Sequence, residues 1–157
     1  MPNWASGECS AVLPTRKADR FRSFFLEGRG EDNKAKDRYF ARTFLDNYES
    51  EANEKGMALV RISFSSAWSA YSCLMQKKDD PKCISLKEAL DECEVKRFTL
   101  HCSEEGIGFE ESMVFDREES EDVIYESRDL YKDPWNEFLD ENYADEEKEG
   151  GKECQIG

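Results

Sequence analysis

Residues 85–103 of this chain, SLKEALDECEVKRFTLHCS, join a helix signature directly to a strand signature. Ser85 is followed three residues later by Glu88, a capping box that marks a helix N-terminus. The apolar residues Leu86, Ala89, Leu90 and Cys93 then recur every three or four positions. This spacing predicts a helix that begins at Ser85 and buries one side.

The hydrophobic period changes to strict alternation in the second half of the same stretch. Phe98, Leu100 and Cys102 share one side of the expected strand, and His101 takes the other side. Successive residues of a strand point to opposite faces of the sheet. We therefore expect a half-buried strand directly after the helix.

The residues before this stretch show the same succession of elements. Residues 8–13 alternate as a strand, and Thr15 is placed to cap a helix with the apolar stripe Ala18, Phe21, Phe24 and Phe25. Two strand-like runs at 39–50 and 57–68 are joined by the polar sequence EANEKG, which predicts a hairpin. Residues 67–76 shift towards helical spacing, with Trp68, Tyr71 and Met75 on one face.

The order strand, helix, strand, strand, helix, strand predicts a ferredoxin-like split β-α-β sandwich of the α+β class. An added hairpin, residues 109–115 with 123–127, extends the sheet, and the sequence DREESED forms its turn. We expect residues 1–130 to form this domain. Residues 131–157 then form an acidic C-terminal helix and a disordered tail.

The negative charge of the chain is concentrated near its C-terminus. The formal net charge is −14, and residues 116–157 hold 16 acidic and 5 basic residues, a net of −11. This excess disfavours nucleic acid as a direct ligand, because phosphate contacts need Lys and Arg. It favours a basic protein surface as the partner, with a solubilising tail as the plain alternative.

A short apolar stripe lies inside the acidic tail. Asp133 and Pro134 are placed at the N-cap and first position of a helix, and Trp135, Phe138 and Leu139 follow at positions i, i+3 and i+4. With Asp140 and Glu141 they form the predicted partner-binding segment. A tail helix that folds back on the core is the alternative.

The cysteines and the hydropathy pattern indicate the cellular compartment and the kinds of site to expect. No apolar run approaches the roughly 20 residues of a membrane span, and the start of the chain has no secretory leader, so we expect a cytoplasmic protein. Without a leader, the six cysteines are expected to be reduced thiols, with Cys9, Cys93 and Cys102 in the core. No pair has the C-x-x-C spacing of a zinc or redox site. We predict no metal site and no cofactor.

The residue types that catalysis needs are scarce. His101 is the only histidine, and its neighbour Cys102 points to the opposite face, so the two cannot form a nucleophile–base pair. Glu111 shares a strand side with Phe109, Met113 and Phe115. The exposed end of the strand is its expected place, and a partly buried carboxyl with a raised pKa is the alternative.

Two tryptophans flank the expected central strands. Trp4 precedes the first strand and Trp68 follows the third, and these strands are neighbours in the split β-α-β order. The indoles are expected to meet at one end of the sheet and to pack there. A ligand cleft formed by Trp4, Trp68, Tyr71 and Glu111 is the alternative.

The opening Met1-Pro2-Asn3-Trp4, the stretch Phe64-x-x-Ala67-Trp68 and the strand after EEGIGFEE resemble a family of small phage and plasmid proteins. This family, the Api-type phage protein domain, has a ferredoxin-like fold and no established activity. The resemblance covers residues 1 to about 116, although Ala5, Ser6 and Gly7 depart from the family pattern. It implies a mobile element in a bacterial host cell.

Three functions follow as hypotheses. The first is a non-catalytic acidic interaction protein that binds a basic protein, for example a nucleic-acid-binding host or defence factor, by mimicking nucleic-acid charge. The second is a small-molecule enzyme with a carboxylate in the cleft near Trp4 and Trp68. The third is a structural module that dimerises through an edge strand. The oligomeric state is left open.

Overall fold

The computed structural model describes residues 3–27, 37–76, 78–104, 106 and 108–129. In chain order the elements are β1 (Trp4–Pro14), α1 (Thr15–Ser23), β2 (Thr43–Ala52), β3 (Met57–Ala67), the short π-helix η2 (Tyr71–Met75), α2 (Leu86–Glu92), β4 (Arg97–Glu104), β5 (Phe109–Asp116) and β6 (Ile124–Asp129). The protein is of the α+β class, and a six-stranded antiparallel sheet dominates it.

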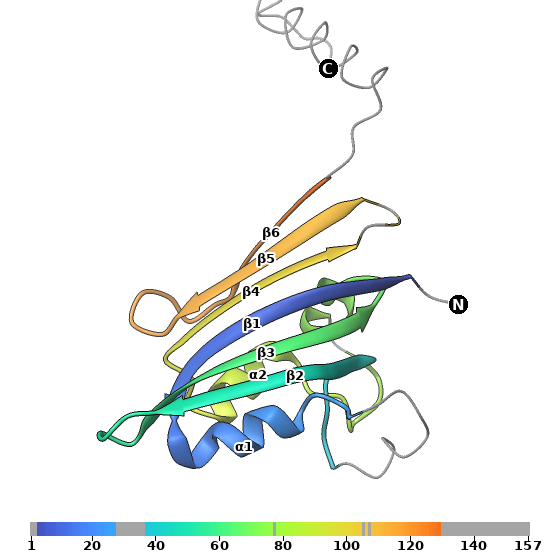
Figure 1. The fold of residues 1–157 in the computed structure, drawn as a ribbon. Coiled ribbons are helices and arrows are strands. Elements are labelled where there is room, and N and C mark those ends of the chain that lie inside the picture. Colours follow the sequence, from blue (N-terminus) through green and yellow to red (C-terminus); the bar gives the residue numbers. More distant parts are fainter. Residues whose placement is uncertain (1–2, 28–36, 77, 105, 107, 130–157) are drawn as a thin grey trace, which may run out of the picture.

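The strands lie in the order β2-β3-β1-β4-β5-β6 (Figure 1). Strand β1 is central and pairs with both β3 and β4, so the prediction that the first and third strands are neighbours is confirmed. The added hairpin is present, because β5 pairs with β4 on one side and with β6 on the other. All of these pairings are antiparallel.

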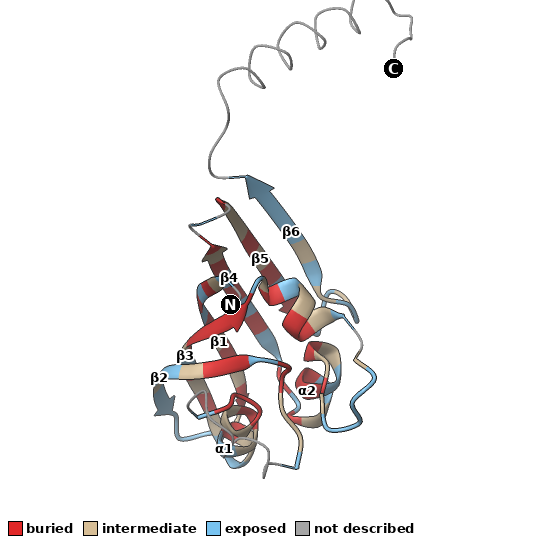
Figure 2. Cartoon of the chain, turned by 90° about the vertical axis from the view of Figure 1, so that its right-hand side faces the viewer, coloured by how far each residue is buried: buried red, intermediate tan, exposed pale blue. Residues whose placement is uncertain are grey.

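The helices cover one face of the sheet. Figure 1 views the sheet from its other face. The core lies between the sheet and the helices, and buried residues follow every second position of β1, β4 and β5 (Figure 2). Rings of Phe21, Phe24, Phe25, Phe40, Phe64 and Phe98 fill it and meet at tilted or edge-on angles. Burial of these large rings contributes strongly to the stability of the fold.

The predicted capping box at the start of α2 is confirmed. The Ser85 side chain accepts from the Glu88 backbone N–H, and the Glu88 carboxylate accepts from the Ser85 backbone N–H. The four apolar residues of its stripe, Leu86, Ala89, Leu90 and Cys93, are at most 1% exposed. Local sequence signals therefore fixed this helix correctly.

Two local predictions are wrong. Thr15 is the first residue of α1, and Pro14 holds the N-cap position without a side-chain cap, because the Thr15 N–H instead donates to the Gly56 carbonyl. Trp68 does not share a helix face with Tyr71 and Met75, because it precedes η2 in a left-handed conformation with φ of 71°. Its amide donates to the Asn3 carbonyl at 2.7 Å, so a tertiary contact ends the helical spacing there.

Candidate functional site

The face of the sheet opposite the helices is covered by no described segment, and we call it the helix-free face. Its side chains come from alternate positions of all six strands, so the partners Glu8 and His101 lie beside each other on it. Small hydroxyl residues form much of its floor: Ser6, Ser10, Ser63, Ser65, Thr99, Ser103 and Ser112. Apolar residues such as Trp4, Val12 and Val114 lie among them, so polar side chains predominate on the face without covering all of it.

Carboxylates outnumber cations on the helix-free face. Seven carboxylates (Glu8, Asp46, Glu49, Glu51, Glu110, Asp116 and Glu126) accompany three arginines (Arg61, Arg97 and Arg128). Each arginine already pairs with a carboxylate of the same face, namely Glu51, Asp116 and Glu110 respectively. The surplus charge therefore lies on the remaining carboxylates.

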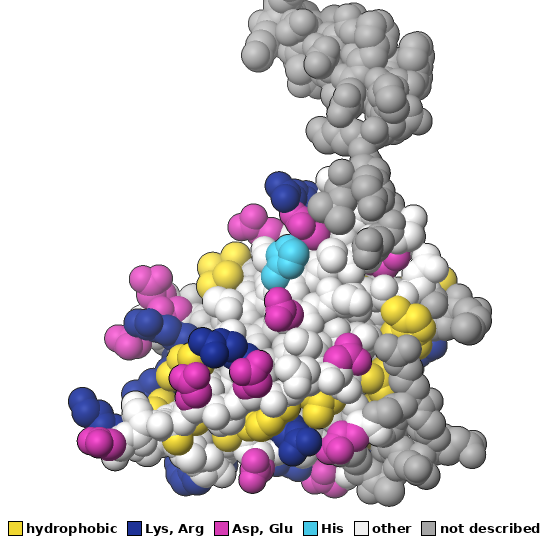
Figure 3. All heavy atoms as spheres, viewed as in Figure 1, with side chains coloured by type: hydrophobic (Ala, Val, Ile, Leu, Met, Phe, Trp, Pro, Cys, Tyr) yellow, Lys and Arg dark blue, Asp and Glu magenta, His cyan; other side chains and the backbone are white. Residues whose placement is uncertain are grey.

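Glu8, Asp46, Glu49 and Glu126 have no ion pair with any described residue. Glu8, Glu49 and Glu126 are exposed, and Asp46 accepts a hydrogen bond of 2.7 Å from the Ser65 hydroxyl. Two adjoining hollows of about 440 and about 360 Å³ share Glu8, Ser63 and His101 in their lining. Figure 3 views this face, with the one histidine in cyan among acidic side chains in magenta.

Charge is divided between the sheet and the segments that carry the helices. Among the described residues, the six strands and the turns at 53–56 and 117–123 hold 15 acidic and 5 basic residues, a net of −10. Residues 15–27, 37–42, 68–76 and 78–96, which we call the helical layer, hold 9 acidic and 10 basic residues, a net of +1. The negative potential therefore belongs to the sheet.

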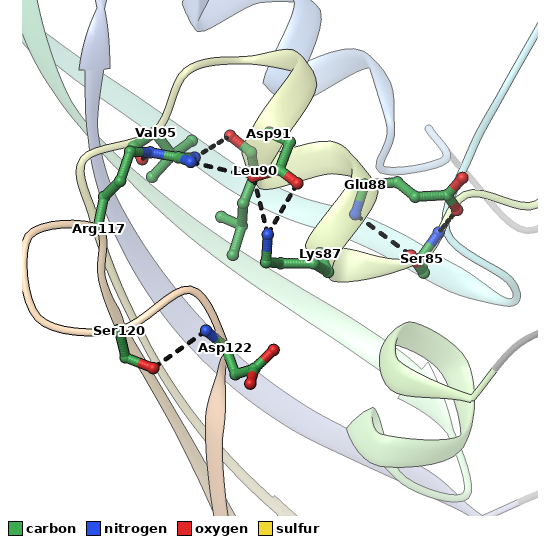
Figure 4. A network of polar contacts seen from close by, with 9 residues as sticks. All are labelled: Ser85, Lys87, Glu88, Leu90, Asp91, Val95, Arg117, Ser120 and Asp122. Carbon is green, nitrogen blue, oxygen red and sulfur yellow. Dashed lines mark hydrogen bonds and ion pairs between the residues drawn. The ribbon is translucent and has the colours of Figure 1, made fainter.

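The acidic residues of the helical layer are largely neutralised in place. Ion pairs join Arg16 to Glu94, Arg20 to Glu92 and Asp37, Arg38 to Glu88, and Lys87 to Asp91. In Figure 4, Arg117 reaches from the end of β5 to Asp91 and to the Leu90 and Val95 carbonyls. These charges stabilise α2 and are not free for a partner.

The expected exposed position of Glu111 is wrong. Its side chain is 1% exposed on the helix side of β5. The carboxylate accepts from the backbone N–H groups of Ala70 and Tyr71 at 2.8 and 2.9 Å, and from the Tyr125 hydroxyl at 2.8 Å. These donors belong to η2 and β6, so the buried carboxylate ties three elements together and has a structural role.

Burial and the Glu111 charge also act on two neighbouring groups. Burial first and the hydrogen bond to Glu111 second raise the pKa of the Tyr125 hydroxyl to about 12. Burial first and the Glu111 charge second raise the pKa of the Cys102 thiol to about 12. Both groups therefore stay protonated at neutral pH, and Cys102 is not an activated nucleophile.

Of the other residues of the predicted cleft, Tyr71 contacts Glu111, whereas Trp4 lies on the opposite face of the sheet. Trp4 lies on the helix-free face and meets Phe44 edge-on, with ring centroids 5.6 Å apart. Trp68 is 46% exposed. Tyr71 contacts Tyr125 with centroids 4.8 Å apart and donates its amide to Glu111. The contacts thus bring together Tyr71 and Glu111 of the four residues.

His101 occupies the side of β4 that the alternation predicts. It is exposed, whereas Cys102 is fully buried on the opposite side. Its Nε2 lies 3.1 Å from the Glu110 carboxylate. In the part of the chain that the structure describes, no three or more His, Cys, Asp or Glu residues are grouped to hold a metal ion. The predicted core cysteines Cys9, Cys93 and Cys102 are buried.

The predicted partner-binding residues Trp135, Phe138, Leu139, Asp140 and Glu141 lie outside the described residues. The picture of a nearly neutral body with an acidic terminus needs correction, because residues 116–129 belong to the β5–β6 hairpin and the sheet itself is strongly acidic. The grouping of Glu8, Asp46, Glu49 and Glu126 was not predicted. These residues come from three different strands, and Asp46 and Glu49 are separated by the register shift of β2, so no spacing along the chain marks them as a group.

Comparison with known proteins adds no relative: no family model, no curated protein and no solved structure matches this chain. Among the described residues, no helix has the length and apolar character that would cross a membrane.

Proposed function

We propose that this protein is a non-catalytic acidic interaction protein that binds a basic partner surface through its helix-free face. The observation that carries the proposal is the division of charge, with a net of −10 on the sheet and its turns against +1 on the helical layer. Four carboxylates of the face form no ion pair within the part of the chain that the structure describes. A basic partner supplies these cations, and each pair that stays in contact with water contributes up to about 1 kcal/mol and speeds association.

The form of the face supports a protein partner with projecting Lys or Arg side chains. The two hollows that meet at Glu8, Ser63 and His101 offer carboxylates at the rim and hydroxyl acceptors on the floor. Guanidinium and ammonium groups are donors only, so both kinds of acceptor suit them. Carboxylates spaced along strands also mimic the charge of nucleic acid, which favours a nucleic-acid-binding protein as the partner.

We further propose that β1 to β4 with α1 and α2 form a ferredoxin-like unit. Its support is the element order and the strand order β2-β3-β1-β4, to which β5 and β6 are added. The opening residues resemble those of phage and plasmid proteins. We therefore also propose that the protein is encoded by a mobile element and acts in the bacterial cytoplasm, where it binds a host or defence factor.

The proposal is tested by titrating the ¹⁵N-labelled full chain with a synthetic peptide of alternating Arg and Gly, followed by amide chemical shifts. We expect the shifts to gather around the two hollows, at Glu8, Asp46 and Glu49, and binding to weaken as salt increases. The double variant Glu8→Gln/Glu49→Gln removes two charges of the face. We expect it to lose about fivefold in affinity, since each of the two lost contacts contributes about 0.5 kcal/mol.

The matched control is Asp19→Asn/Asp79→Asn, which changes the net charge equally at two exposed residues of the helical layer. We expect this control to bind the peptide nearly as the unmodified chain does. Equal losses in both double variants, or shifts spread over the helical layer, contradict the proposal. No binding of the peptide at low salt contradicts it as well.

A further inference from the structure

The two edges of the sheet are protected to very different degrees. At β2 the chain at Leu26 adds itself to the strand, because its N–H donates to the Thr43 carbonyl at 2.9 Å and its carbonyl accepts from Leu45 at 2.7 Å. A register shift between Leu45 and Asn47 then bends this edge. Covering and bulging are common ways in which edge strands avoid pairing with another chain.

At the opposite edge, β6 pairs with β5 on one side, and no described residue pairs with its outer side. Five of its six residues are exposed. In an antiparallel strand, alternate residues direct their N–H and C=O groups to one neighbour and the rest direct them away. Within the described residues, half of the backbone groups of β6 thus form a template for a further strand.

The side chains of β6 alternate in charge along the helix-free face. Glu126 and Arg128 both point to that face, with Ser127 between them. Arg128 lies opposite Glu110 of β5 and pairs with it. Glu126 lies opposite Ser112 and has no ion pair with any described residue. Strand β6 thus presents Glu126, which has no ion pair with a described residue, two positions from Arg128. The Arg128 side chain is 75% exposed and can contact a second carboxylate besides Glu110.

We propose that β6 pairs antiparallel with β6 of a second copy of this chain, with Ser127 opposite the second copy's Ser127. A two-fold axis perpendicular to the sheet keeps the helix-free faces of both copies on one side, so only residues of equal parity oppose each other. The pairing is therefore centred on a single residue. The charges of β6 decide which residue this is.

Like charges directly opposite each other destabilise a strand pair, and opposite charges stabilise it. Centring on Glu126 or on Arg128 sets two like charges against each other. Centring on Ser127 places Glu126 opposite the second copy's Arg128, twice by symmetry. A row of alternating charge then runs from Glu110 through Arg128 to the second copy's Glu126, and the two sheets become continuous.

Sedimentation of the full chain over a concentration series, at about 0.15 M salt, tests the proposal. We expect a monomer–dimer equilibrium. Glu126→Lys and Arg128→Glu each place like charges at both symmetric positions, and each is expected to weaken the dimer at least about tenfold. An equimolar mixture of the two variants restores opposite charges at both positions of a heterodimer, so its dimer fraction is expected to recover.

A cross-link tests the register itself, in a Cys154→Ser background. Residues directly opposite in an antiparallel pair lie about 4.5–5.5 Å apart at Cα, within the roughly 4.4–6.8 Å that disulfides span. Ser127→Cys is therefore expected to form a disulfide dimer under mild oxidation. Glu126→Cys is the control, since its own counterpart in the second copy lies about 8 Å away.

Three outcomes overturn the proposal. The first is a monomer at all concentrations, including the concentration used for cross-linking. The second is a dimer whose affinity the two charge variants do not change, or whose mixture does not recover. The third is cross-linking of Glu126→Cys as readily as Ser127→Cys. Far-ultraviolet circular dichroism and thermal unfolding of each variant separate these outcomes from a loss of fold.

Discussion

The helix-covered face and the helix-free face belong to the same strands, yet different forces shape them. On the helix-covered face, side chains such as Phe64 and Phe98 are about 1% exposed and pack against the helices. On the helix-free face, most hydroxyls and carboxylates stay in contact with water. Apolar side chains also lie there, among them Trp4, Val114 and Ile124. Stability is expected to reside on the first face and recognition on the second.

The largest difference in stability between variants of the two faces is expected when a core aromatic residue is removed. Phe64→Ala removes a ring that packs against Phe25, with centroids 5.8 Å apart, and leaves a cavity. We expect a loss of about 3–5 kcal/mol in the free energy of unfolding. Val114→Ala on the helix-free face is expected to change it by less than about 0.5 kcal/mol. Urea unfolding measures both, and similar losses contradict the comparison.

Glu110 and Glu111 are neighbours in sequence that point to opposite faces. Glu111→Ala leaves the amides of Ala70 and Tyr71 and the hydroxyl of Tyr125 without their acceptor. We expect a loss of about 3 kcal/mol, since each unsatisfied buried donor costs about 1–3 kcal/mol and some rearrange towards water. Glu111→Gln keeps one acceptor and is expected to lose about half as much.

The control for this pair is Glu110→Gln, which removes a partly buried charge whose partners His101 and Arg128 are themselves exposed. Its stability is expected to stay close to that of the unmodified chain in the same chemical denaturation. Hydrogen exchange adds a local readout, because Glu111→Ala is expected to speed exchange at the Ala70 and Tyr71 amides. If Glu110→Gln costs as much as Glu111→Ala, the assignment of the two faces fails.

The capping box of α2 is expected to have a smaller effect. Ser85→Ala removes the acceptor of the Glu88 amide and half of the reciprocal cap. The expected loss is about 1 kcal/mol. Ser112→Ala, on the helix-free face, changes a hydroxyl without a cap and is expected to be nearly neutral in thermal unfolding. Equal shifts in melting temperature for the two variants argue against a stabilising cap.

The smallest expected effect is an acid-range change in stability. Hydrogen bonding from Lys87, and then from Arg117, holds the pKa of Asp91 below its ordinary value of about 4. A pKa that folding lowers adds stability that is complete above about pH 4 and is lost as pH falls through the folded-state pKa. Asp91→Asn is expected to reduce slightly the fall in the free energy of unfolding between pH 6 and pH 3. Denaturation at pH 3 and at pH 6 measures it, and an unchanged slope contradicts the expectation.

Local signals in the sequence were sufficient for most of the elements. The capping box at Ser85 predicted α2, the alternation from Phe98 to Cys102 predicted β4, and the apolar period of residues 109–115 predicted β5. These signals work because hydrogen bonding within a helix turn and burial on one side of a strand depend on near neighbours. Element order was also enough to place β1 beside β3.

The wrong predictions all involve contacts between distant residues. Trp68 leaves the helical spacing because its amide meets the Asn3 carbonyl, 65 positions away in the chain. Glu111 is buried because donors from the start of η2 and from β6 converge on its carboxylate. The residues next to Glu111 in the sequence do not predict these donors. The grouping of Glu8, Asp46, Glu49 and Glu126 likewise required the strand order to be known.

The sequence by itself determined the composition, the excess of acid and the sites of helices and strands, because these depend on residue types and on their spacing along the chain. Only the tertiary structure decided which carboxylates share a surface and which one lies in the core. The physical reason is that strand pairing joins residues from distant parts of the chain, and the side on which the helices pack decides which of two alternating sets of side chains meets water.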